Sequence, residues 1–265
     1  MKKYWLVIKQ GWQNRLVYRL DFILWRVRQL LTSFMSLFFW QAAFSSPSFT
    51  QLGGYNQDEM MSYIFMAAVL DSLINASALN GLSYRIYSGS FNNELTKPFN
   101  IFAYLGSQEV ADKLQNFIFV IAEIILLFLI FQPGISIPGP IVLSIFLLWA
   151  VLGALINFLI SLLFGAIGFW NPETWAPKFL FYMILSVTAG KQFPLDIMPK
   201  IVQKVVFLTP FPYLAFVQTQ MFLNKLSPQQ VIFYSFGFIF WLITLGIIVK
   251  MVWQRGLRDY STAGQ

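Results

Sequence analysis

The stretch TAGKQFPLDIMPKIVQKVVFLTPFPY, residues 188–213, combines an apolar sequence with a backbone that cannot remain helical. Each of its four prolines lacks an N–H donor and disfavours a helix before it: Pro194, Pro199, Pro210 and Pro212. The preceding apolar segment, Trp175 to Ala189, covers about 22 Å as a helix, less than a hydrocarbon core of about 30 Å. We therefore expect a helical hairpin that enters the membrane part-way and returns to the same side, covered by protein or water. A structured outer loop is the alternative, and the apolar run from Ile201 to Leu208 favours the hairpin.

The composition of the whole chain is that of an integral membrane protein. Of its 265 residues 57% are hydrophobic, 18% are aromatic and only 11% are charged. The absence of Cys and His removes disulfides, thiolate or imidazole catalysis and the usual zinc or haem ligands. The net charge of +7 is spread over loops and forms no stripe that would bind nucleic acid. We expect membrane lipid as a partner, and neither an enzyme nor a metal or cofactor site in this chain.

The apolar segments predict an all-α fold with six transmembrane helices in a single domain, residues 1–265. Residues 1–20 read as an interfacial helix that carries Trp5 and Trp12, and they lack the apolar core and cleavage site of a signal peptide. The re-entrant hairpin lies between the fifth and sixth spans, within residues 190–226. The six expected spans are Phe22–Phe44, Met60–Leu79, Leu114–Phe131, Ile141–Phe164, Trp175–Ala189 and Val231–Trp253.

The basic residues indicate how these spans are oriented. With six spans both termini lie on one side, and 14 of the 18 Lys and Arg residues fall on that side against 4 on the other. By the positive-inside rule both termini are cytoplasmic in a multi-pass protein of the plasma (inner) membrane. The hairpin around Pro194 then faces outward.

The cytoplasmic loop at residues 83–113 contains a short predicted helix that ends before Pro98. Phe91 and Leu95 share one face of it, beside Glu94 and Lys97. Such a helix could dock a cytoplasmic partner or pack onto the cytoplasmic end of this protein, and the sequence leaves both alternatives open.

Two acidic residues are expected within the membrane, Asp71 in the second span and Glu123 in the third. Each costs about 2.5–3.5 kcal/mol at the centre of a helix, so each should face a cavity, a partner or the bundle interior. The sequence places no Lys or Arg at the same depth. Together with Asn75 they could line a translocation path or relay protons; alternatively, each is a protonated carboxyl bonded to a neighbouring helix through Asn75 or Asn157.

Three motifs resemble those of ABC-2 type exporter permeases, in particular the small six-span permeases that work with separate ATPase subunits. GKQFPLDIMP at residues 190–199, followed by PF at residues 210–211, is similar to the family signature G-x-x-FPL-x-x-x-P…PF. Residues 89–98 are similar to the cytoplasmic coupling segment, with Lys97 where Arg is common. GLRDYSTAG at residues 256–264 resembles the L-x-x-Y-x-x-A-G ending of these subunits.

The resemblance implies a permease that exports a hydrophobic or amphipathic substrate, such as a natural product, drug or lipid, by alternating access. The sequence has no G-x-x-x-x-G-K-[ST] motif, so separate ABC ATPase subunits would bind ATP and Mg. A second permease subunit, identical or related, would complete a homodimer or heterodimer. ATPase coupling would fall to Phe91, Glu94, Leu95 and Lys97. The outer gate would be formed by Phe193, Pro194, Asp196, Pro199, Pro210 and Phe211.

Three other functions remain open from the sequence. A proton-coupled secondary transporter would use Asp71 and Glu123, although the two halves of the chain show none of the internal repetition usual in such proteins. A non-transporting membrane subunit, such as a scaffold or assembly factor, would show no substrate-stimulated ATP turnover in complex with an ATPase. A polysaccharide-exporting ABC permease would share the motifs above.

Overall fold

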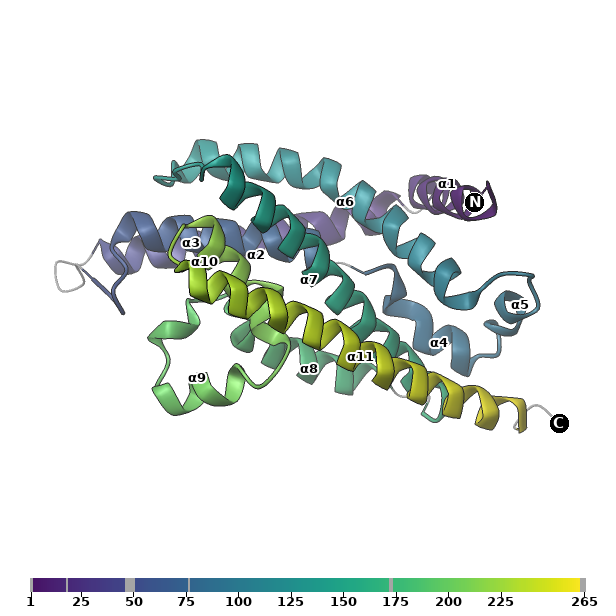
Figure 1. Cartoon of the computed structure of the whole chain (residues 1–265). Helices are drawn as coiled ribbons and strands as arrows, with labels where there is room; N and C mark the ends of the chain where they lie inside the picture. Colours follow the sequence, from purple (N-terminus) through teal and green to yellow (C-terminus); the bar gives the residue numbers. More distant parts are fainter. Residues whose placement is uncertain (1, 18, 46–50, 76, 172–173, 263–265) are drawn as a thin grey trace.

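The computed structural model describes residues 2–17, 19–45, 51–75, 77–171 and 174–262, and within these ranges the chain is helical with short connections. The side chains of residues 2, 14–17, 19, 21, 22, 75, 261 and 262 lie outside the description. Long helices run side by side along the molecule, and helix α1 (Lys2–Val17) crosses one end (Figure 1). The predicted all-α fold is confirmed.

Five of the six predicted spans fall on a single helix each, whereas the helix of the second, Met60–Leu79, ends at Leu70 and gives way to short turns. Three helical stretches of the described chain are long and apolar enough to cross a membrane, namely Ile101–Phe131, Pro140–Phe169 and Pro228–Tyr260, with a possible fourth formed by the bent pair Gln57–Ile74 and Ala78–Tyr87. The helices on which the six predicted spans fall, wholly or in part, are α2 (Arg19–Phe44), α3 (Gln57–Leu70), α6 (Ile101–Phe131), α7 (Pro140–Ala166), α8 (Trp175–Thr188) and α11 (Pro228–Thr262).

Several helix ends follow directly from the local sequence. Asn56 caps α3 by accepting a hydrogen bond from the Glu59 N–H at 2.9 Å, and the Glu59 carboxylate accepts one in return from the Asn56 N–H at 3.1 Å. Pro140 begins α7 at a position where its missing N–H has no intrahelical partner. Ser227 and Gln230 exchange similar bonds before α11.

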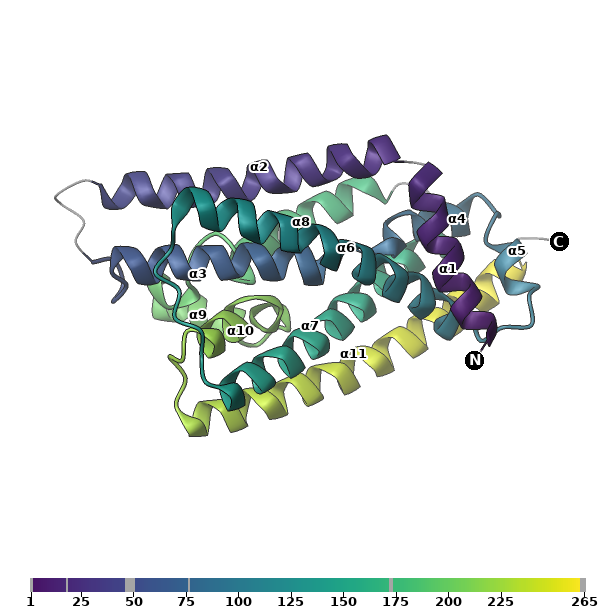
Figure 2. The ribbon, with the colours of Figure 1, turned by 90° about the horizontal axis from the view of Figure 1, so that it is seen from above.

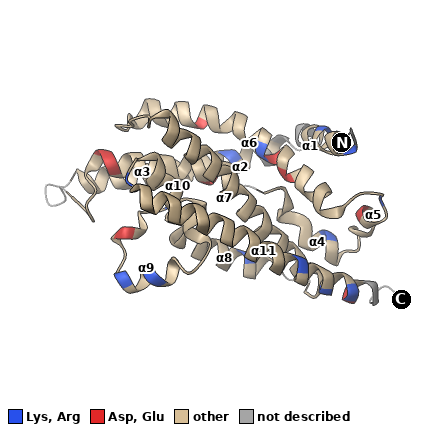
Figure 3. Cartoon of the chain, in the orientation of Figure 1, with Lys and Arg blue, Asp and Glu red and all other residues tan. Residues whose placement is uncertain are grey.

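The helices form an arrangement with a polar side and an apolar side. Helix α7 packs along α11, α2 packs along α3, and α1 packs on α6. Seen from above, α2 and α11 lie on opposite sides of the bundle, with α3, α6 and α7 between them (Figure 2). The charged side chains gather towards the two ends of the molecule and on α6, whereas α7 and most of α11 carry none (Figure 3). Helix α1 and the end of α11 lie at the same end.

Residues 190–226 fold into short helices rather than an extended loop. They contain α9 (Lys200–Val206), α10 (Phe216–Phe222) and 3₁₀ turns at Leu195–Ile197 and Phe211–Leu214. Every residue of α10 is buried, and α10 packs on α7 and α3. By contrast, α9 exposes Ile201, and Leu208 borders it with 77% of its surface exposed. The segment thus returns into the bundle after an apolar outer turn.

Candidate functional site

The second apolar segment is broken in the middle of the molecule. Helix α3 continues into a π-helical turn at Asp71–Asn75, followed by a 3₁₀ turn at Ala78–Gly81 and by α4 (Leu82–Tyr87). The two parts of this segment meet at 53°. Its sequence, DSLINASALNG, is rich in residues that favour turns and caps over helix interiors. π-Helical turns of this kind occur frequently at functional sites.

Polar side chains from α6 and α7 satisfy the backbone freed by this break. Lys113 and Asn157 both donate to the carbonyl of Ile74, at 2.6 and 2.8 Å. The Glu109 carboxylate accepts from the N–H of Ala78 at 3.0 Å and lies 3.3 Å from the Lys113 ammonium. An unsatisfied backbone group in this apolar setting would cost several kcal/mol, so these contacts make the break stable.

Glu123 joins three helical segments at the same level. It is 6% exposed and accepts hydrogen bonds from Ser33 of α2 at 3.0 Å and from Ser72 of the π-turn at 2.9 Å. The carboxyl is thus bonded to neighbouring segments, as one interpretation of the sequence expected, but its partners among the described residues are serines and not Asn157. Asn157 bonds the Ile74 carbonyl instead, and the side chain of Asn75 lies outside the described residues.

Asp71 forms an ion pair that the sequence interpretation excluded. The Lys191 ammonium lies 2.6 Å from one carboxylate oxygen of Asp71, and Gln29 of α2 donates to the other at 2.8 Å. The expectation that no basic residue reaches the depth of Asp71 is wrong. Gly190 adopts the left-handed conformation at φ +75° and turns the chain after α8. The Gly190 carbonyl accepts a hydrogen bond from the Tyr63 hydroxyl at 2.6 Å, and this bond holds residues 190–226 against α3.

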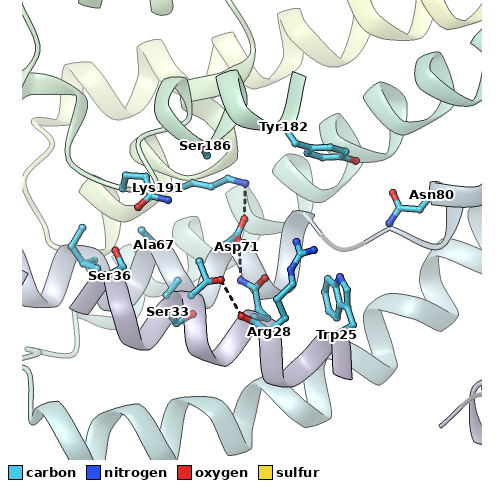
Figure 4. Close-up of a pocket in the computed structure, with 15 residues that line it drawn as sticks. Trp25, Arg28, Ser33, Ser36, Ala67, Asp71, Asn80, Tyr182, Ser186 and Lys191 are labelled. Atoms are coloured by element: carbon cyan, nitrogen blue, oxygen red, sulfur yellow. Dashed lines mark hydrogen bonds and ion pairs between the residues drawn. The ribbon is translucent and has the colours of Figure 1, made fainter. Parts of the chain in front are cut away.

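A groove of 280 Å³ opens around this ion pair, between α2, α3 and α8. Figure 4 shows Asp71 and Lys191 bonded across it, with Arg28 and Trp25 rising from α2 on the same side. Its lining is mixed: polar groups come from α2 and α8, and Ala67, Ala68 and Ile64 of α3 form an apolar wall. Among the residues that the structure describes, the charged ones that line the groove are Arg28, Asp71 and Lys191.

The predicted outer-gate residues lie in two places. Asp196 accepts hydrogen bonds from Tyr55 at 2.7 Å and from Gln220 of α10 at 3.1 Å. Burial, together with the Asp196 carboxylate, raises the pKa of Tyr55, so the phenol remains a donor. Lys225 lies 3.8 Å from the centre of the Tyr55 ring and pairs with Glu59 at 3.0 Å. We call these five residues the outer cluster.

The remaining predicted gate residues surround the ends of the hairpin. Pro194 is buried, Phe193 is partly buried and Pro199 is exposed. Pro210 is buried, and the Phe211 ring lies 5.5 Å from that of Phe181 on α8. The N–H of Phe216 donates to the carbonyl of Ala189 at 2.9 Å, so the start of α10 is tied to the end of α8.

The predicted coupling residues differ in exposure. Phe91 is fully buried, with its ring 5.9 Å from that of Trp253 on α11, so it holds the segment onto the protein's own end. Glu94 pairs with Arg85 at 2.6 Å. Burial raises the pKa of Glu94 although Arg85 acts in the opposite direction. Leu95 and Lys97 remain exposed.

The sequence interpretation missed a row of buried polar residues on α6, of which Glu109 supports the break. Glu109, Asp112 and Asn116 are all buried on α6, at the i, i+3, i+7 spacing of one helix face. The predicted third span began only at Leu114, so Glu109 and Asp112 were assigned to the loop at 83–113. The helical periodicity of polar residues in an apolar surrounding was the signal that could have found them.

The broken helix, the ion-paired groove and the apolar bundle define a multi-pass membrane protein of the permease class. Among the described residues no group of three or more acidic side chains could hold a metal ion. The profile of the family described as ABC-2 family transporter protein matches residues 30–264, and the chain belongs to that family. It is thus an ABC-2 type permease, the transmembrane and generally non-catalytic component of an ABC transporter. A comparison with curated proteins gives no match.

Proposed function

We propose that this chain is the six-span permease subunit of an ATP-driven exporter in the plasma (inner) membrane, with both termini in the cytoplasm. Helix α2 and the 14-residue α8 would complete the six spans, and residues 190–226 would form the re-entrant outer hairpin. The observation that carries the proposal is the groove at the break in the second span, since discontinuous membrane helices commonly form transport sites.

The lining of the groove supports an amphipathic rather than a purely hydrophobic substrate. Arg28, Gln29, Thr32 and Ser36 of α2 face it with polar groups, while Ala67 and Ala68 of α3 are apolar. A wholly hydrophobic substrate would displace water from the Arg28 guanidinium without replacing its hydrogen bonds, which is costly. We propose Asp71 and Glu123 as path residues in structural roles: one holds Lys191, and the other joins α2, the π-turn and α6.

A second permease subunit would cover the open side of the groove. Helix α8 has a single buried residue, Leu185, and exposes Trp175, Leu180 and Ile184 by 56% or more. A membrane helix packed on so little of its own chain suits a position at an interface with another subunit. The subunit could be a second copy or a related permease.

The cytoplasmic segment at residues 83–113 would dock the ABC ATPase, which binds ATP and Mg. Phe91 and Glu94 would support the segment from within, and Leu95 and Lys97 would contact the partner. Tyr84 and Tyr87 of α4 are 70% and 56% exposed beside them and extend the same surface.

The test is purification of the tagged permease from its native membranes, followed by identification of any ABC ATPase that is recovered with it and measurement of ATP hydrolysis. Leu95→Asp with Lys97→Glu should abolish recovery of the ATPase, whereas Lys204→Glu on α9, the same charge reversal at the opposite end, should leave it unchanged. Recovery that is unaffected by the first variant would contradict the docking site. Transport that continues without ATP hydrolysis and stops with an uncoupler would instead support the proton-coupled alternative.

A further inference from the structure

We infer that the groove binds the acidic group of an amphipathic substrate, with Arg28 as its partner. The inference rests on the proposed permease function and narrows its substrate class to an amphiphile that carries a carboxylate or phosphate.

The first step is the charge balance of the groove. Asp71 and Lys191 neutralise each other at 2.6 Å, and Gln29 satisfies the second oxygen of Asp71. Arg28 adds a further positive charge, and no acidic residue among those that line the groove lies within ion-pair distance of it. The groove therefore carries a net positive charge, which attracts an anion and opposes a cation.

The second step is the contrast between the two arginines of α2. The Arg26 guanidinium donates to Asn116 of α6 and lies 5.1 Å from the centre of the Trp25 ring, so the protein itself holds this charge. Arg28, two residues further on, lines the groove instead (Figure 4). A charge within a membrane segment requires water, a lipid phosphate or a bound anion as its partner.

The third step is the shape of the lining. Trp25 and the wall formed by Ile64, Ala67 and Ala68 offer apolar surface next to the guanidinium. A volume of 280 Å³ is at the lower end of the range for small-molecule sites, so it fits a small head group with part of an alkyl chain. An acid joined to a chain would place charge on Arg28 and methylene groups on the alanines.

The same contacts disfavour a positively charged substrate. A cationic substrate would need a carboxylate, and Asp71 is the only acidic residue of the lining within the described chain. A cationic substrate would have to displace Lys191 from Asp71, and Lys191, which is 13% exposed, would remain next to the site and repel it. An acidic group requires no displacement.

The experiment uses the purified full-length permease in phosphatidylcholine nanodiscs. The probes are dodecanoate with a photoreactive diazirine at the end of its chain, and the uncharged methyl amide of the same molecule. Labelled protein is measured by intact mass against probe concentration, and labelled peptides are then mapped. We expect the acid to reach half-maximal labelling at about a tenfold lower concentration than the amide, as suits one charge-assisted hydrogen bond.

Matched variants decide whether Arg28 is responsible. Arg28→Gln should remove the preference for the acid, Arg28→Lys should retain part of it, and Lys250→Gln, which removes an exposed charge on α11, should leave it intact. A monodisperse elution profile for each variant shows that it is folded. Equal labelling by acid and amide in the native protein, or a preference that survives Arg28→Gln, would overturn the inference.

A competition experiment with the same nanodiscs identifies the source of the acid. Competition by phosphatidic acid in the disc with the same dependence on Arg28 would assign the site to a lipid head group, and its absence would assign it to a soluble acid. Both outcomes support an acidic amphiphile. Recovery of the ATPase is measured separately. If the native protein shows no preference for the acid but still recovers the ATPase, this inference alone is contradicted. If it prefers the acid but recovers no ATPase, the proposed function is contradicted.

Discussion

The two sides of the bundle are held together by different physical means. Where α7 meets α11, the contacts are mostly apolar: the rings of Trp149 and Phe238 lie 5.3 Å apart, and one hydrogen bond joins Trp149 to Ser235 at 3.2 Å. On the same helix α11, Gly237 makes room for Tyr213 of the turn at Phe211–Leu214. Around the groove between α2, α3 and α8, polar contacts are added to the apolar core: Asp71 of the π-turn bonds Lys191, which follows α8, and Gln29 of α2.

Under the proposed function, the first side would serve support and the second side transport. Lipid competes with apolar side chains for apolar helix surfaces, so membrane helices gain stability chiefly from close packing at small residues. The α7–α11 side uses this means and leaves little room for movement. The groove side relies on polar pairs, which can exchange partners with water or a substrate. We therefore expect substitutions at α7–α11 to affect folding and those at the groove to affect function.

The largest expected effect is on the close-packed side. A Cβ at Gly237 would lie 2.0 Å from the Tyr213 hydroxyl and 2.5 Å from the ring, so Gly237→Leu forces the ring or the helix to move. Overpacking of this kind costs about 1–3 kcal/mol and more where nothing can shift. We expect loss of the monodisperse peak and a lower midpoint of thermal unfolding in detergent.

The same helix offers a matched control for that substitution. A Cβ added at Gly246 would meet no neighbouring atom within 4 Å, so Gly246→Leu adds the same side chain without a clash. Unfolding midpoints that fall equally in both variants would show that α11 is not closely packed, and the contrast between the two sides would fail.

The second prediction concerns the ion pair of the groove. Lys191→Met leaves the Asp71 carboxylate, which is 24% exposed, with Gln29 as its partner. We expect a loss of about 1–2 kcal/mol in the free energy of unfolding, below the value for fully buried pairs because water reaches the groove. Asp71→Asn together with Lys191→Met should recover most of it. Additive losses in this double-mutant cycle would contradict a coupled pair.

The sequence allowed prediction of the close-packed side but not of the groove. The helix positions follow from apolar runs with local start and stop signals, such as Asn56 and Pro140, and these act over a few residues. The pairing of Asp71 with Lys191 joins residues 120 positions apart and depends on how Gly190 turns the chain back. The sequence predicted that the hairpin would be irregular, whereas its depth depends on contacts such as Tyr63 with Gly190.

The burial of Phe91 was unpredictable for a similar reason. A short amphipathic helix presents the same pattern whether its apolar face meets a partner or its own protein. The choice depends on Trp253, which lies on the last helix and approaches Phe91 only in the folded chain.

A smaller effect is expected where the hairpin joins the start of α3. Tyr55→Phe removes one of the two hydrogen bonds to the Asp196 carboxylate and keeps the ring beneath Lys225. The substitution also removes the hydrogen bond that Tyr55 accepts from Gln220. Because Gln220 still donates to Asp196, we expect a net loss of about 1 kcal/mol. Proteolysis between Pro194 and Pro210 measures it, because opening of the hairpin exposes this stretch. An unchanged cleavage rate would show that the outer cluster does not hold the hairpin.

The smallest effect tests a carboxylate placed at the end of the close-packed side. Burial raises the pKa of Glu94, so the native state holds its proton more tightly than the unfolded chain does. The contribution of Glu94 to stability therefore falls as pH rises from the ordinary pKa of a glutamate through the raised one. Compared with Glu94→Gln, the native protein should lose stability as the pH rises above the ordinary pKa of a glutamate. Thermal unfolding of both proteins as a function of pH measures the difference. A difference that is constant with pH, or that changes in the opposite direction, would mean that Arg85 outweighs burial, and that the close-packed side accepts an ionised group as readily as the groove does.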